Sequence, residues 1–171
     1  MSNAFVIIDA QKYFINDFTK GVPEKIARFA ERKFDSVIFL KFVNAESSNF
    51  SKDLEWKKMF SSPEIDIVPE LENLAKKSVV FSKTSFSAFR SKEFVDFLRE
   101  NKVDRLYICG FDTDGCVLST ALEAFDLGYA VRVLEDLCAS HHGPAFHKNA
   151  VTIMRRNAWS IISNSNGLTI I

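Results

Sequence analysis

Residues 110–117 read Gly-Phe-Asp-Thr-Asp-Gly-Cys-Val and stand between an apolar run and a stretch with helical periodicity. The apolar run is Leu-Tyr-Ile-Cys at residues 106–109. Residues 116–127 repeat apolar side chains with the period of a helix, and Gly128 follows as a typical helix stop. A buried strand that turns through a short polar loop into a helix is typical of a parallel α/β sheet.

The same alternation of apolar runs and amphipathic stretches continues along the chain. Most of the apolar runs lack polar alternation, which indicates strands buried on both faces. We expect strands at residues 5–8, 37–43, 79–81, 106–109, 130–134 and 168–171, and helices at 23–33, 92–101, 116–127 and 144–157. The sequence therefore predicts a three-layer, doubly wound, Rossmann-like α/β sheet of about six mainly parallel strands, with helices on both faces.

The length of 171 residues suits one domain with one core, and we treat residues 1–171 as that single domain. Residues 44–74 are less regular than the rest, with a serine-rich segment and two prolines. They predict a long structured connection, and such a connection in a compact domain is often functional. The 17 phenylalanines are interpreted as aromatic filling of the core, with a subunit interface as a second place for them.

Composition argues against several classes of partner. Lys plus Arg and Asp plus Glu each number 22, so there is no electrostatic case for a nucleic acid. No apolar run is long enough to span a bilayer, and we expect no signal peptide. Cys109, Cys116 and Cys138 form no CxxC pair, which predicts reduced thiols. We therefore expect a cytoplasmic protein whose partner is a small molecule.

Three residues that can carry chemistry come at or just after the ends of predicted strands. Asp9 closes the first strand, Lys83 follows the third, and Cys116 lies six residues past Gly110. In an open α/β sheet, ligands bind outside the carboxyl ends of the strands, so these side chains should meet at one edge. Each has an ordinary structural reading alone, but together they supply a base, a cation and a nucleophile.

Cys116 has the setting of a reactive thiol. A cysteine at the start of a helix meets the positive end of the helix dipole and free backbone N–H groups, which favour the thiolate. The same N–H groups can hold a developing oxyanion. Thr113 or Asp114 is the expected N-cap. Cys109, inside an apolar strand, and Cys138 are interpreted as structural.

The sequence predicts neither a metal site nor a cofactor. His141, His142 and His147 lie in one C-terminal segment without a carboxylate in a recognised metal-binding spacing. We interpret them as a helix cap, surface groups or a subunit contact. The glycines form neither GxGxxG nor a P-loop, which argues against a flavodoxin-like nucleotide-binding module.

Four segments together resemble the isochorismatase-like cysteine hydrolases, which include nicotinamidases and N-carbamoylsarcosine amidases. The segments are Asp9-Ala10-Gln11, Lys83 with the run Ser87-Ala88-Phe89, residues 110–117, and Asp136-Leu137-Cys138-Ala139-Ser140. They follow one another in the order of the family, and the resemblance covers essentially the whole chain.

The resemblance implies a role for each matching residue. Asp9 would take the thiol proton of Cys116, and Lys83 would orient the site and lower the thiol pKa. The backbone N–H groups of Asp112 and Cys116 would form the oxyanion hole, with a cis peptide bond between Phe111 and Asp112. The reaction would run through thiolate attack, loss of ammonia or an amine, and hydrolysis of a thioester. The resemblance also implies a homodimer or homotetramer.

The chain departs from the family pattern in two places. Nicotinamidases carry an Asp-x-His metal cluster after the second strand, whereas residues 42–46 contain no histidine. Asp112 stands where the family usually has a small apolar residue, and its carboxylate would either point away or repel anionic substrates. We therefore expect a metal-independent hydrolase of an amide-type C–N bond. The alternatives are a redox or sensor thiol protein without hydrolytic activity, and an isochorismatase or nicotinamidase proper.

The pocket residues are predicted from their positions beside the motifs. The candidates are mostly aromatic, which suits a small, flat or partly apolar acyl group. They are Gln11, Phe14, Trp56, Phe86 and Phe111.

Overall fold

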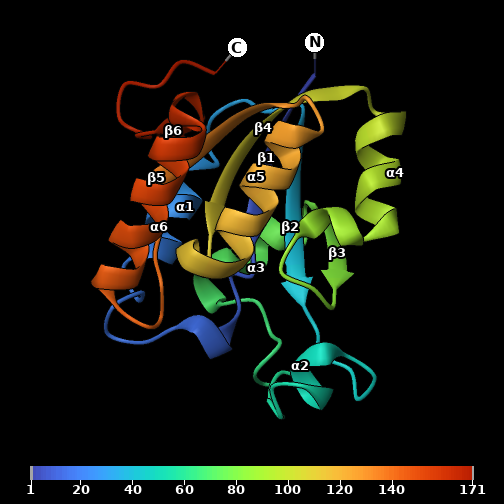
Figure 1. Cartoon of the computed structure of the whole chain (residues 1–171). Coiled ribbons are helices and arrows are strands. Elements are labelled where there is room, and N and C mark those ends of the chain that lie inside the picture. Colours follow the sequence, from blue (N-terminus) through green and yellow to red (C-terminus); the bar gives the residue numbers. More distant parts are fainter. Residues whose placement is uncertain (1, 171) are drawn as a thin grey trace.

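The computed structural model describes residues 2–170 and has a parallel sheet of six strands between two layers of helices (Figure 1). The strands are β1 (Ser2–Ile8), β2 (Ser36–Phe42), β3 (Val79–Lys83), β4 (Val103–Gly110), β5 (Ala130–Cys138) and β6 (Ile162–Ser163). Their order across the sheet is β3-β2-β1-β4-β5-β6, and every pairing is parallel. The predicted doubly wound α/β fold is confirmed.

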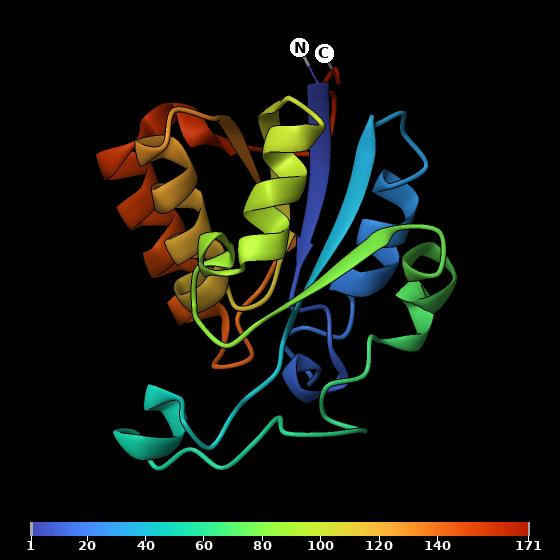
Figure 2. The same ribbon diagram turned by 90° about the vertical axis from the view of Figure 1, so that its right-hand side faces the viewer.

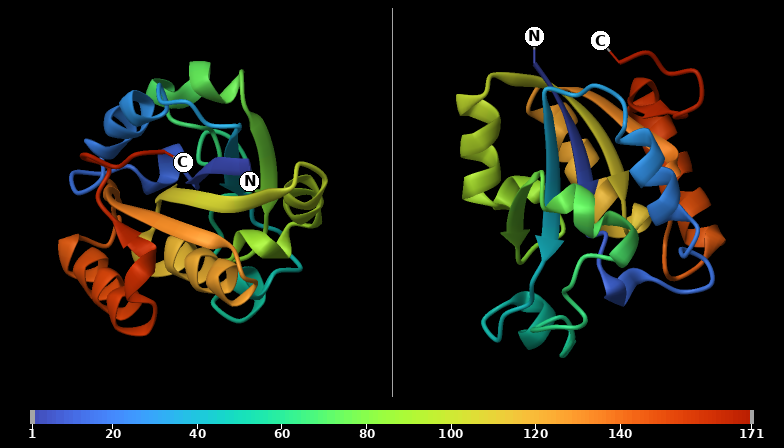
Figure 3. Two further views of the ribbon diagram at one scale, coloured as in Figure 1. Left: turned by 90° about the horizontal axis from the view of Figure 1, so that it is seen from above. Right: turned by 180° about the vertical axis from the view of Figure 1, so that it is seen from behind.

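The helices divide between the two faces of the sheet. Helices α1 (Val22–Phe29) and α3 (Pro69–Ala75) cover one face, and α4 (Lys92–Glu100), α5 (Leu118–Asp126) and α6 (Pro144–Asn157) cover the other (Figures 2 and 3). The short helix α2 (Asn49–Lys52) lies beyond the carboxyl ends of the strands (Figure 1). No helix within residues 2–170 is both long and apolar enough to cross a bilayer.

The chain reverses its direction of winding next to β1. It proceeds outward from β1 through β2 to β3, then returns to the other side of β1 and continues through β4, β5 and β6. Since β1 is covered on both faces, residues 4–8 have no exposed surface. The switch point falls between β1 and β4, and in such sheets the crevice at this point is where ligands bind.

The sixth strand is not where the apolar pattern placed it. Residues 168–170 have no regular structure, and Ile171 lies outside the described residues. Strand β6 is Ile162–Ser163, which pairs with Val133 and Leu134 of β5. The chain leaves α6 beside β5, so the first extended residues after the helix, Ile162 and Ser163, pair with that edge of the sheet. The later segment is held elsewhere, by hydrogen bonds from the guanidinium of Arg32 to backbone carbonyls of the tail.

The irregular segment at residues 44–74 is a structured connection, as predicted, but it contains two helices, α2 and the start of α3, that the sequence pattern did not predict. Pro69, interpreted as a sign of irregularity, occupies the first turn of α3, where its missing N–H costs nothing.

The bounds of three other helices can be compared with those predicted. Helix α1 ends at Phe29 rather than at residue 33. Helix α5 begins only at Leu118, after a π-helical turn at Thr113–Val117. Helix α6 has the predicted bounds.

Gly110 allows the loop after β4 to lie directly against the end of β1. Its φ is +117°, and a Cβ atom there would be 2.0 Å from the carbonyl oxygen of Ile8. The N–H of Phe111 donates to the same oxygen at 2.9 Å. On the other side, Thr113 N–H donates to the Ala139 carbonyl at 3.0 Å. The loop that carries Cys116 is therefore fastened between β1 and β5.

Replacing Gly110 by alanine should destabilise the protein by more than about 3 kcal/mol, because the methyl group would overlap the Ile8 carbonyl and the backbone would be strained. Gly128→Ala is the matched control. Gly128 also has a positive φ, +88°, but no atom lies within 4 Å of its would-be Cβ, so its cost should be about 1 kcal/mol. Free energies of unfolding from urea titrations would compare the two. Equal losses would contradict the close approach at Gly110.

Candidate active site

The carboxyl edge of the sheet brings Asp9, Lys83 and Cys116 into contact, as the sequence predicted. Asp9 directly follows β1 with a φ of 49°, and its N–H donates to the Leu40 carbonyl at 2.8 Å. Lys83 is the last residue of β3. Its Nζ donates to Asp9 Oδ2 at 2.7 Å, to the Ser85 carbonyl at 2.9 Å and to Cys116 Sγ at 3.3 Å.

One oxygen of Asp9 remains available within this buried cluster. The side chains of Asp9 and Lys83 have 0% exposure, and the three protons of the ammonium have three acceptors. Asp9 Oδ1, in contrast, has no hydrogen-bond partner among residues 2–170. The Cys116 thiol is close enough to this carboxyl group to influence its pKa. An unpartnered carboxylate oxygen beside a thiol is a candidate proton acceptor.

Burial makes Asp9 a stronger base than a free aspartate. Burial raises the pKa of Asp9 above its ordinary value, and the charge of Lys83 offsets only part of that rise. Burial lowers the pKa of Lys83, but Asp9 and Cys116 more than compensate, so the net direction is upward. The ammonium thus keeps its proton, while the carboxylate beside it has a raised affinity for one.

The Cys116 thiol does not have the lowered pKa that the sequence predicted. Burial raises the pKa of Cys116 well above its ordinary value, Asp9 raises it further, and Lys83 lowers it only in part. The helix dipole does not lower the thiol pKa because Cys116 is the fourth residue of the π-helical turn and is only 7% exposed, so that loss of hydration dominates. The resting thiol is protonated and needs a base.

The turn before Cys116 presents a free backbone donor. The peptide bond between Phe111 and Asp112 is cis, as the resemblance implied. The Asp112 N–H donates to no backbone or side-chain acceptor within residues 2–170. The prediction of Thr113 or Asp114 as N-cap is wrong, because Asp112 holds that position and makes no side-chain capping bond. The Thr113 hydroxyl is engaged with His147 Nδ1 at 2.8 Å.

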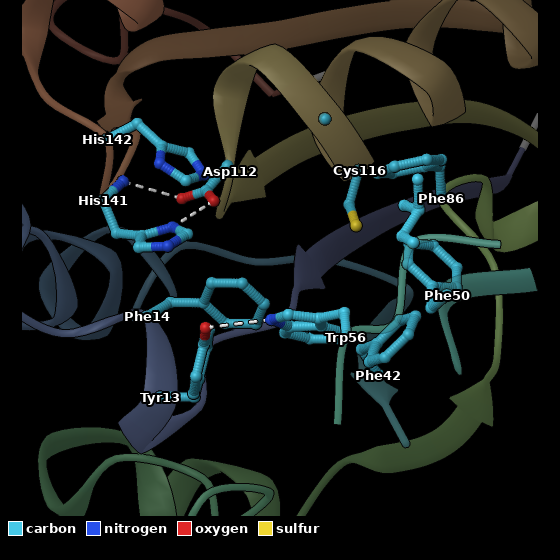
Figure 4. A pocket seen from close by; sticks show the side chains of 12 residues that line it. Tyr13, Phe14, Phe42, Phe50, Trp56, Phe86, Asp112, Cys116, His141 and His142 are labelled. Atoms are coloured by element: carbon cyan, nitrogen blue, oxygen red, sulfur yellow. Dashed lines mark hydrogen bonds and ion pairs between the residues drawn. The ribbon is translucent and has the colours of Figure 1, made fainter. Parts of the chain in front are cut away.

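A cavity of about 310 Å³ opens over the thiol (Figure 4). This volume is at the lower end of the range for small-molecule sites. The walls are largely aromatic, and neither lysine nor arginine is among the lining residues. Those residues are Tyr13, Phe14, Phe42, Phe50, Leu54, Trp56, Phe86, Asp112, Gly115, Cys116, His141 and His142.

Three of the five predicted pocket residues, Phe14, Trp56 and Phe86, line the cavity. The remaining aromatic wall, formed by Tyr13, Phe42 and Phe50, was not predicted from the sequence. The Tyr13 hydroxyl accepts a hydrogen bond from Trp56 Nε1 at 3.3 Å. Adjacency to Phe14 was the available signal for Tyr13. Phe50 and Leu54 come from the irregular segment around α2, where no periodic pattern identifies the inward side.

Gln11 and Phe111 do not line the cavity, so their predicted placement is wrong. Gln11 is fully buried, and its side-chain amide connects the end of β2 to the segment around Ile65 by hydrogen bonds. It accepts from Phe42 N–H at 2.8 Å and donates to the carbonyls of Phe42 and Ile65, each at 2.9 Å. Phe111 has no exposed surface and packs in the core. Gln11 therefore fixes the backbone of Phe42, which lines the cavity, without lining it itself.

His141 and His142 line the cavity, where the sequence pattern did not place them, and His142 is exposed as its interpretation as a surface group expected. They follow Ser140 past the carboxyl end of β5, and that position at the sheet edge was the signal. The N–H of His141 donates to Asp112 Oδ1 at 2.8 Å, and its Nδ1 pairs with Asp112 Oδ2. This pairing raises the pKa of His141. The Asp112 carboxylate thus turns toward the imidazoles.

The segment after β2 does not fit the metal cluster that the resemblance associates with nicotinamidases. Asn44 is the polar residue at that place, and its amide is fully used. Its Nδ2 donates to the carbonyls of Trp56 and Lys58 at 3.0 Å, and its Oδ1 accepts from Ala45 N–H and two serine hydroxyls. Asn44 organises the loop and offers no free donor atom to a metal.

Comparisons with known proteins identify relatives of one kind. A nicotinamidase of Escherichia coli strain K12 is 43% identical over 60 residues, which are 32% of this chain and 28% of that protein. A probable inactive nicotinamidase of Arabidopsis thaliana is 24% identical over 159 residues, or 81% of each chain. The matched stretches span only about a third of the length of the first curated relatives.

The structural comparison agrees with the sequence comparison. N-carbamoylsarcosine amidase from Thermoplasma acidophilum matches with a TM-score of 0.81 at 22% identity, covering 99% of this chain and 100% of that chain. At this identity the match shows a shared fold. The model of the isochorismatase domain matches residues 3–165, which is nearly the whole chain. The protein therefore belongs to the isochorismatase family of hydrolases.

Proposed function

We propose that this protein hydrolyses an amide-type C–N bond of a small molecule through a covalent thioester on Cys116. The observation that carries the proposal is the buried Oδ1 of Asp9, which has no hydrogen-bond partner among the described residues and belongs to the carboxyl group beside the buried Cys116 thiol. The Lys83 ammonium contacts both groups, at 2.7 and 3.3 Å. A base, a nucleophile and a fixed cation are the components of nucleophilic acyl transfer.

The first half of the reaction forms the thioester. The thiol proton of Cys116 moves to Asp9 Oδ1 as Sγ bonds to the substrate carbonyl carbon. The electron pair of the C=O bond moves to oxygen, where the N–H groups of Asp112 and Cys116 stabilise the charge. The C–N bond then breaks, and the leaving nitrogen takes the proton from Asp9. Ammonia or an amine departs, and the acyl group stays on sulphur.

The second half uses the same residues in reverse. Asp9 accepts a proton from a water molecule that attacks the thioester carbonyl. The tetrahedral intermediate collapses, the C–S bond breaks, and the proton returns from Asp9 to the sulphur of Cys116. Side chains and backbone groups supply every donor and acceptor in both halves, so the covalent chemistry is proposed to be independent of a metal.

The cavity supports a substrate class as well as a reaction. Its aromatic walls favour a flat or partly apolar acyl group. The lining contains no lysine or arginine to pair with an anion, and it includes the Asp112 carboxylate. A small neutral amide, ureide or N-carbamoyl compound meets these conditions better than a carboxylate-bearing substrate.

The alternatives receive less support from the site. A sensor cysteine relies on thiolate character, whereas burial raises the pKa of Cys116 well above its ordinary value. A nicotinamidase with its metal after the second strand would need free donor atoms where Asn44 is fully engaged.

Replacing Cys116 by serine should lower turnover at least about a thousandfold, because the nucleophile is lost while the pocket remains. Ammonia release from a panel of primary amides, ureides and N-carbamoyl compounds would measure it, with intact-protein mass spectrometry to detect an acyl adduct in the wild type. The control is Cys109→Ala, which removes a fully buried thiol in β4 and should leave turnover intact. Absence of turnover by the wild type across the panel would count against the proposal.

The pH profile should identify Asp9 as the base. Asp9 acts when deprotonated, so kcat/KM should fall as the pH drops through an apparent pKa above the ordinary 3.8. The charge of Lys83 lowers the pKa of Asp9, so Lys83→Met should move this acid limb to higher pH. Lys12→Met removes a partly exposed lysine paired with Asp66 and should leave the limb in place. An unmoved limb in Lys83→Met would rule out this assignment.

A further inference from the structure

The cavity contains a second cluster of reactive groups, separate from the thiol. Asp112, His141 and His142 lie together at one side of it in Figure 4, away from Cys116. One carboxylate oxygen and one ring nitrogen from each histidine all lie within 4.8 Å of one another. We propose that these three residues bind a divalent transition-metal ion of the zinc or ferrous type, with open coordination positions toward the cavity.

The donor set fits such an ion. Imidazole nitrogens suit zinc, iron and copper, and a carboxylate completes sets of two histidines and one acid that leave positions open. Three protein ligands with an open position are typical of catalytic sites rather than of closed structural ones. The single negative charge of Asp112 partly balances the ion, and no lysine or arginine lines the cavity to repel it.

The fold already orients these ligands. Asp112 comes from the loop after β4, and the histidines from the loop after the adjacent strand β5. The His141 N–H fixes Asp112 Oδ1 at 2.8 Å, and the His142 N–H donates to Ser140 Oγ at 3.2 Å. The two imidazole rings have centroids 3.9 Å apart. Hydrogen bonds to the carboxylate and to the loop are the outer support that metal ligands usually have.

Binding requires one local change. Ligand atoms 2.0–2.2 Å from a tetrahedral ion lie about 3.4 Å from one another. The pairing between Asp112 Oδ2 and His141 Nδ1 is closer than that and must open. The His141 side chain is 21% exposed and His142 is on the surface, so both rings have room to turn. The ion would replace the hydrogen bond between the two side chains.

This site differs from one after β2, where Asn44 is fully engaged. An ion held by Asp112 would face the same cavity as the thiol. A substrate with a second lone-pair donor could then contact the ion while its carbonyl meets Cys116. That last consequence rests on the proposed hydrolase function, whereas metal binding itself does not.

The test is metal uptake by the full chain, first stripped with a chelator. Calorimetric titration with Zn²⁺, and with Co²⁺ followed by visible absorption, should show one ion per chain in the wild type. His142→Gln, and the double variant with His141→Gln, should weaken binding at least about tenfold. Zn²⁺ should raise the melting temperature of the wild type and not that of the double variant. His147→Gln, a histidine outside the cluster, should bind as the wild type does.

Several outcomes would overturn the site. These are no uptake by the wild type, equal uptake by the histidine variants, or an equal loss in His147→Gln. Loss of the ion in Cys116→Ser but not in His142→Gln would place it on the thiol and refute the assignment. Because the His142 side chain is exposed, this variant should fold normally, which circular dichroism would check. None of these readouts depends on hydrolysis, so failure of the proposed reaction remains distinguishable.

Discussion

Asp9 and Lys83 form an ion pair with no exposed surface, and the site is arranged around it. Transfer of each charge out of water costs several kcal/mol, and a buried pair often stabilises a fold no better than apolar residues would. The pair is tolerable because the ammonium has three acceptors, one just after β1, one after β3 and one in the π-helical turn after β4. These contacts fix three chain segments relative to one another. Stability alone does not explain such a cluster, whereas the acyl-transfer chemistry proposed above gives it a role.

The aromatic residues set the environment of this pair. Strand β2 lies between β1 and β3, and its last residue, Phe42, places its ring 5.2 Å from the Lys83 Nζ. The Phe42 ring also contacts Phe50 and Trp56, and all three line the cavity. Elsewhere phenylalanines fill the core, as Phe5 does against Phe29. The same residue type therefore packs the sheet and excludes water from the charges at its edge.

Strands and site residues that depend on local sequence pattern were predicted correctly, whereas those that depend on tertiary contacts were not. Five strands, Asp9, Lys83 and Cys116 followed from apolar runs and from the rule that strand ends meet at one edge. The sixth strand was predicted at the wrong place, because residues 162–163 pair with β5 and the apolar residues 168–170 have no regular structure. The prediction that Gln11 and Phe111 line the pocket was wrong because adjacency to a motif does not determine the direction of a side chain. His141 and His142 were missed because their partner, Asp112, is distant in sequence.

Two opposing effects act on the protonation state of Cys116: the helix terminus favours the thiolate, and burial favours the thiol. A helix terminus stabilises a nearby charge by about 0.3–1 kcal/mol, whereas full burial can disfavour the charged form of a side chain by up to about 4–7 kcal/mol. Burial therefore dominates, and the pKa of the thiol rises. A protonated thiol is a poor target for oxidants and stray electrophiles. On the proposed mechanism, the thiolate forms only when a bound carbonyl can accept its electrons and Asp9 its proton. On this proposal, the burial that makes the ion pair costly also keeps the Cys116 thiol inactive until substrate binds.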